Sequence, residues 1–86
     1  MKLEENLMGL GQDLATHASA QIVAEYVDLV RSGEYGVALE VLCDRLDDAQ
    51  EPLTRVEVNA IQSLAAEMGL DRPSIKFIRE LEVAGS

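Results

Sequence analysis

The sequence predicts an all-α fold, a small bundle of four to five short helices in a single domain spanning residues 1–86. Apolar residues make up 48% of the chain, but aromatic residues only 3%, and there is no Trp. The core must therefore consist mainly of Leu, Val, Ile, Ala and Met, a mixture that favours helices packed on helices. The apolar residues also recur at helical spacing, and cap and turn residues separate the periodic segments.

Four leucines predict a first helix. They follow one another at spacings of four, three and four, so they share one helix face: Leu3, Leu7, Leu10 and Leu14. Gly9 and Gly11 lie in the same segment, and each weakens a helix by about 1 kcal/mol relative to Ala. We therefore expect this helix to depend on tertiary packing.

A broad apolar face predicts a second helix, with Thr16 or Ser19 as its N-cap. It ends at Gly33, which can adopt the left-handed conformation. The link through Gly33 is short, so the second and third helices should be antiparallel neighbours. Tyr26 lies on the apolar face and is predicted to be a core residue. The face contains Ile22, Val23, Tyr26, Val27, Leu29 and Val30.

The third helix should begin around Glu34. Pro52 should stop the segment that precedes it, because a proline disfavours helical geometry in the residue before it. Its core stripe is Ala38 or Leu39, then Leu42 and Leu46, with Val41 and Cys43 beside it.

Thr54 and Glu57 have the spacing of a capping box, which predicts the start of a fourth helix. Gly69 should end it, with Leu70 as the apolar contact of a Schellman-type stop. The residues expected to face inward are Val58, Ile61, Leu64, Ala65 and Met68.

Pro73 suits the first position of a last helix. Residues 73–82 fit either a short helix that buries Ile75, Ile78 and Leu81 or a strand through Ile75 and Phe77. Residues 83–86 are expected to fray.

The net charge of −9, from 16 acidic and 7 basic residues, argues against a nucleic-acid-binding protein, because phosphates would be repelled. It favours a basic partner. The single cysteine, Cys43, excludes an intrachain disulfide and is typical of a reducing cytoplasm. The chain shows no signal-peptide pattern and no apolar run of about 18 to 20 residues, so we expect a cytoplasmic protein without a membrane span.

Four carboxylates share one side of the predicted third helix, and a fifth follows in the loop: Glu40, Asp44, Asp47, Asp48 and Glu51. Several of them lie near the helix C-terminus, where the macrodipole is already negative. Like charges four residues apart also destabilise a helix. Such a face is either a solvated surface partly neutralised by Arg45 or a docking surface for a basic protein.

No residue pattern predicts catalysis, a cofactor or a metal site. The acidic residues lack the alternate spacing and central Gly of an EF-hand loop. His17 and Cys43 are the only residues of their types, so no Cys/His metal spacing exists. We interpret His17 as a surface or cap-region residue and Cys43 as half-buried. Tyr35, in a turn, is an interface candidate, because Tyr is enriched at binding hot spots.

Three short stretches resemble the central signature of the MafI-family immunity proteins. They are GEYGVALE at residues 33–40, LCDRL at 42–46 and PLT at 52–54, within a region of similarity covering residues 20–71. The resemblance implies a small cytoplasmic antitoxin that binds and blocks a secreted polymorphic or contact-dependent toxin domain, often a nuclease. It defines no contact residues.

The resulting hypothesis is an immunity protein without enzymatic activity whose acidic face binds a basic toxin domain. The predicted partner-binding residues are Glu34, Tyr35, Glu40, Asp44, Asp47, Asp48 and Glu51. The alternative is a helical adaptor or oligomerisation module, in which an apolar stripe pairs with itself or with another helix.

Overall fold

The structure, a computed structural model, describes residues 2–83. They form five α-helices and one 3-10 helix, which confirms the all-α prediction. The elements are α1 (Lys2–Leu14), α2 (Ala20–Arg31), α3 (Tyr35–Ala49), α4 (Arg55–Met68), α5 (Pro73–Lys76) and the 3-10 helix η1 (Phe77–Leu81).

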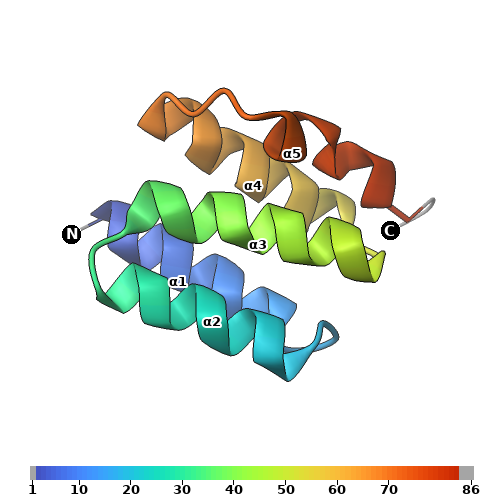
Figure 1. Ribbon diagram of the computed structural model, residues 1–86, viewed down its shortest axis with the longest axis horizontal. Helices are drawn as coiled ribbons and strands as arrows, with labels where there is room; N and C mark the ends of the chain where they lie inside the picture. The colour runs from blue at the N-terminus through green and yellow to red at the C-terminus, as the bar shows by residue number, and fades with distance from the viewer. Residues whose placement is uncertain (1, 84–86) are drawn as a thin grey trace.

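The first four helices run in alternating directions and close into a four-helix bundle (Figure 1). Helix α1 contacts α2 and α4, and α3 contacts the same two helices. The prediction that α2 and α3 are antiparallel neighbours is therefore confirmed. Helix α5 and η1 return along α3 and α4, so α3 has neighbours on both sides and presents one face to solvent (Figure 1).

The predicted stripes form the core. Helix α1 contributes its last three leucines, α3 buries Ala38 and Leu39 together, and Cys43 is fully buried rather than half-buried. Tyr26 is the largest fully buried side chain. Its hydroxyl donates a hydrogen bond to the backbone oxygen of Leu7 over 2.7 Å. The core thus contains a polar group that is satisfied by α1, as a buried hydroxyl requires.

Three helices end in a left-handed residue. Gly33 and Gly69 have φ angles of 80° and 69°, as predicted, and Gln50 has a φ of 51° at the end of α3. In each case the next residue's N–H bonds the carbonyl five positions back, as in a Schellman motif. Helix α3 therefore ends before Pro52, at a residue that lacks glycine's freedom.

The capping box of α4 is confirmed. The Glu57 N–H donates to the Thr54 hydroxyl over 3.1 Å, and the Thr54 N–H donates to Glu57 Oε1 over 2.9 Å. The prediction for α2 is only partly right. Ser19 is the N-cap residue, but its side chain makes no cap hydrogen bond. Thr16 instead donates to the Asp13 carbonyl, at the end of α1.

The chain after Pro73 is helical, so the strand alternative for residues 73–82 is wrong. Ile75, Ile78 and Leu81 are buried as the helical pattern requires. The expectation that residue 83 frays is also wrong, because the Val83 N–H donates to the Leu53 carbonyl over 2.8 Å. Residues 84–86, the rest of that prediction, lie outside the described part of the chain.

Candidate functional site

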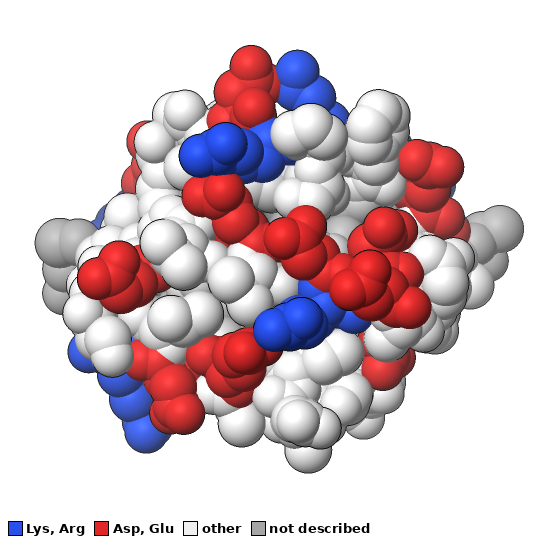
Figure 2. Space-filling view, viewed as in Figure 1, with Lys and Arg blue, Asp and Glu red and all other residues white. Residues whose placement is uncertain are grey.

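Three of the predicted carboxylates lie together on the exposed face of α3. Asp44, Asp47 and Asp48 are exposed, and none of them forms an ion pair within residues 2–83. Figure 2 shows a band of acidic side chains across this side of the molecule, with basic side chains on either side of it. We call these three residues the α3 acidic cluster.

Glu40 lies one turn before this cluster but is paired. Arg72 Nε is 2.8 Å from Glu40 Oε1, and the Glu40 side chain is 27% exposed. Arg72 is the N-cap residue of α5, so the C-terminal segment neutralises this end of the acidic face. Glu40 is therefore adjacent to the cluster but less available to a partner.

Glu51 does not extend the acidic face. Its carboxylate accepts a hydrogen bond from the Ser19 N–H over 3.2 Å, and the residue is half-buried. A carboxylate near a helix N-terminus interacts favourably with the macrodipole. Glu51 therefore supports the start of α2, where the Ser19 side chain makes no cap bond.

Glu34 and Tyr35 lie at the opposite end of α3. The helix has 15 residues, so its ends are about 20 Å apart at 1.5 Å per residue. The Tyr35 hydroxyl donates to Glu4 Oε1 over 2.7 Å, and this hydrogen bond raises the pKa of Tyr35. Tyr35 thus joins α3 to α1, and the seven predicted residues do not form one continuous patch.

A groove of about 600 Å³ lies beside the acidic cluster, between the start of α2 and the end of α3. Arg45 on its wall pairs with Glu25 of α2, with Arg45 Nε 3.0 Å from Glu25 Oε1. The hydrogen bond and charge of Glu25, with smaller contributions from Asp48 and Asp44, raise the pKa of Arg45. The groove is lined by Ser19, Gln21, Ile22, Glu25, Arg45, Asp48 and Ala49.

The sequence reasoning missed Glu25 and the groove. Glu25 and Arg45 are 20 residues apart, and no local pattern indicates that they pair. The antiparallel prediction for α2 and α3 was the only available signal, and it did not specify the rotation of either helix.

His17 and Cys43 occupy structural positions. His17 Nε2 lies 2.7 Å from Glu57 Oε2, and the Glu57 side chain is 5% exposed. The same carboxylate serves the capping box, so Glu57 connects the α1–α2 loop to the start of α4. Burial raises the pKa of Cys43 to about 12, which keeps the thiol protonated near neutral pH.

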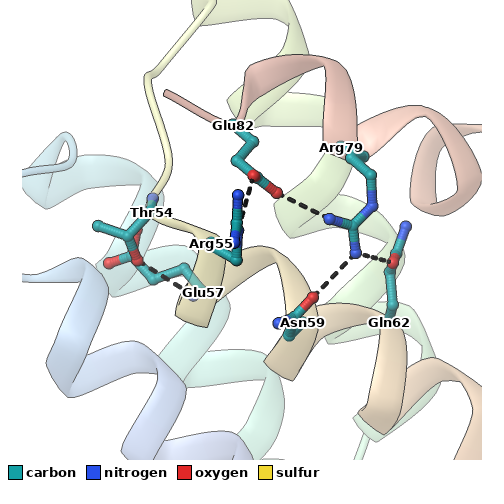
Figure 3. Close-up of polar contacts among 7 residues, drawn as sticks. All are labelled: Thr54, Arg55, Glu57, Asn59, Gln62, Arg79 and Glu82. Carbon is teal, nitrogen blue, oxygen red and sulfur yellow. Dashed lines mark hydrogen bonds and ion pairs between the residues drawn. The ribbon is translucent and has the colours of Figure 1, made fainter. Parts of the chain in front are cut away.

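A second polar network joins α4 to the C-terminal segment (Figure 3). The Arg79 guanidinium donates to Asn59 Oδ1 over 2.9 Å, to Gln62 Oε1 over 2.8 Å and to Glu82 Oε1 over 2.7 Å. Glu82 also accepts from Arg55 Nε over 3.2 Å. We call these five residues the α4 seam, in which both cations contact carboxylate or amide oxygens.

No group of three or more His, Cys, Asp or Glu side chains within residues 2–83 is arranged to hold a metal ion. No helix in that range has both the length and the apolar character needed to cross a bilayer. Comparisons with protein-family models, with curated proteins and with solved structures found no match for this chain.

Proposed function

We propose that this protein is an immunity protein that neutralises a cognate toxin domain, a basic nuclease, by stoichiometric binding through the α3 acidic cluster. One observation carries the proposal. Three exposed carboxylates gather near the negative end of a helix, without an ion pair among the described residues, although helix stability favours cations there. A basic partner would supply the missing positive charge.

The adjoining groove supplies shape as well as charge. Asp48 lies on its lining beside the Arg45–Glu25 pair, and Ile22 adds apolar surface, so a Lys or Arg side chain can lay its stem against Ile22 and direct its charge to Asp48. Long-range attraction between the acidic face and a basic surface speeds association. The resemblance of residues 33–54 to the MafI signature supports the same proposal.

The first experiment is co-expression of the chain with a candidate toxin domain from a neighbouring gene, scoring cell survival and co-purification. Survival together with a stable complex is the expected result. Survival without a complex contradicts inhibition by binding, and loss of viability without a complex contradicts the proposal as a whole.

The surface is tested with two variants that remove the same charge. Asp44→Asn/Asp48→Asn should slow association with the toxin domain about tenfold at low salt and reduce its salt dependence. The control, Asp28→Asn/Glu80→Gln, removes two exposed carboxylates from α2 and η1 and should change the rate much less. Equal effects of the two variants would show that only net charge matters.

The adaptor alternative predicts concentration-dependent self-association. Sedimentation of the isolated chain at increasing concentration separates the two functions, because the immunity function requires no self-association.

A further inference from the structure

Gly9 and Gly11 lie two residues apart in α1, yet only Gly11 has a packing reason to be glycine. A Cβ at Gly11 would lie 3.3 Å from Tyr26 Cε2 and 3.4 Å from Val27 Cγ2, so the glycine allows α2 to approach closely. A Cβ at Gly9 would have no neighbouring atom within 4 Å. Ala would fit there and would favour the helix by about 1 kcal/mol, so internal packing does not explain Gly9.

Gly9 lies on the wall of a groove of about 470 Å³ between α1 and α4. Gly9 and Ala60, which are half-buried, give this groove its accessible apolar surface; Leu10 and Leu64 also line it but are only 3% and 5% exposed. The lining comprises Glu5, Asn6, Gly9, Leu10, Gln12, Asp13, Ala60, Ser63, Leu64 and Glu67. Because Gly9 has no side chain, this part of the groove stays open to solvent.

Every charged residue that lines the groove is acidic. Glu5, Asp13 and Glu67 form no ion pair within residues 2–83, and the lining includes no Lys or Arg. The groove beside α3 differs, because Arg45 and Glu25 pair across it. The α1/α4 groove therefore presents negative charge around an apolar surface, which attracts a positively charged ligand.

We propose that the α1/α4 groove is a second docking site, which binds a cationic amphipathic segment of another protein. Apolar side chains of the segment lie against Gly9 and Ala60, and its Lys or Arg residues pair with the acidic rim. A second copy of this chain is a poor occupant, because its net charge of −9 adds repulsion. No residue of α3 lines the groove, so the proposal is independent of the toxin-binding surface.

The direct test is an NMR titration of the whole ¹⁵N-labelled protein with a synthetic helical peptide that carries Lys on one face and Leu and Ala on the other. We expect the largest shift changes at the amides of Asn6, Gly9 and Ser63. A matched peptide with Glu in place of Lys should not bind. Shift changes confined to α3, or no binding of the Lys peptide, would overturn the proposal.

A substitution that fills the groove tests the contribution of its shape independently of its charge. Gly9→Leu should weaken peptide binding by at least about fivefold, the loss typical of one important interface position. Ala24→Leu, which adds the same side chain at an exposed position of α2, should leave binding unchanged. Gly9→Ala should raise the melting temperature by about 4 °C, since it favours the helix. Undiminished peptide binding by folded Gly9→Leu would contradict the proposed site.

A charge variant keeps the test valid even if Gly9→Leu fails to fold. Glu5→Gln/Glu67→Gln removes two charges from the rim, and Asp44→Asn/Asp48→Asn removes two from α3. The rim variant should weaken binding of the Lys peptide more than the α3 variant does. Equal weakening, or a larger effect of the α3 variant, would overturn the proposal.

Discussion

Helices α3 and α4 have similar lengths, 15 and 14 residues, but they differ in how their ends are capped and in whether their surface charges are paired. Helix α4 begins with a complete capping box, ends at a left-handed glycine and lies beside the paired charges of the α4 seam (Figure 3). Helix α3 has no side-chain hydrogen bond at its N-cap and ends at a left-handed Gln50, whose side chain donates to the Asp47 carbonyl. Its last turns carry aspartates that form no ion pair within residues 2–83.

The difference indicates that stabilising ion pairs are concentrated in α4 and the segment after it, and not in α3. Four of the five cations in ion pairs of the described residues belong to the segment from Arg55 to Arg79. Helix α3 contains one cation, Arg45, which pairs with α2. Departures from local rules at an exposed face are typical of functional surfaces, so we expect substitutions in α4 to lower stability and selected substitutions in α3 to raise it.

The largest expected effect is at the start of α4. Glu57→Ala removes the acceptor of the Thr54 N–H and the partner of His17, so the free energy of unfolding should fall by about 2 to 3 kcal/mol. Urea unfolding measures this change. Glu67→Ala, an exposed change in the same helix, should stay within about 0.5 kcal/mol. Equal unfolding midpoints for the two variants would show that the capping box adds no stability.

The second contrast is the left-handed residue that ends each helix, and exchanging Gln and Gly between these two positions tests it. Gln50→Gly should stabilise the protein by about 0.5 kcal/mol, because glycine adopts a positive φ without strain but loses the exposed hydrogen bond from Gln50 Nε2 to the Asp47 carbonyl. Gly69→Gln should destabilise it by about 1 kcal/mol, and a Cβ there meets no atom within 4 Å, so the loss would come from the backbone alone. Thermal unfolding of both variants checks the signs, and a stabilising Gly69→Gln would refute this explanation.

The α4 seam should contribute less, because its side chains are partly exposed. Arg79→Ala breaks three side-chain contacts, but with the Arg79 side chain 49% exposed we expect a loss of only about 0.5 to 1 kcal/mol. Faster amide hydrogen exchange at Leu53 and Val83, which bond to each other's segments, should accompany it. Arg31→Ala, which removes an arginine without an ion pair in residues 2–83, is the control and should leave this exchange unchanged.

The smallest expected effect is a gain in the α3 acidic cluster. Asp44→Asn/Asp48→Asn removes like charges four residues apart near the negative helix end, so stability should rise by about 0.3 to 1 kcal/mol at low salt. Added salt should reduce the gain, because it screens exposed charges. Asp28→Asn/Glu80→Gln controls for net charge. A loss of stability in the Asp44/Asp48 variant would mean that attraction to Arg45 outweighs the repulsion.

Much of the fold was predictable because its causes are local. The apolar period of α1, the capping box at Thr54 and the turn glycines Gly33 and Gly69 each depend on residues at most a few positions apart. The end of α3 was harder to predict from the sequence. Pro52 marks a boundary, but the left-handed residue is Gln50, and Gln has no intrinsic preference for that conformation.

The candidate site was predicted only in part. The shared side of Asp44, Asp47 and Asp48 follows from helical spacing alone. The roles of Glu40 and Glu51 do not, because each carboxylate meets a residue distant in the sequence, Arg72 or Ser19. A long charged side chain can reach partners on any adjacent element, so its neighbours must be known first.

The sequence by itself determined the helical class, the core stripes, most helix ends and the acidic side of α3, since periodicity and capping act within a few residues. Only the tertiary structure decided which charges are paired, why Gly11 is a packing residue and Gly9 is not, and where grooves form. Those properties depend on how α1, α2, α3 and α4 lie against one another, and helix rotation and separation arise from the packing of the whole core.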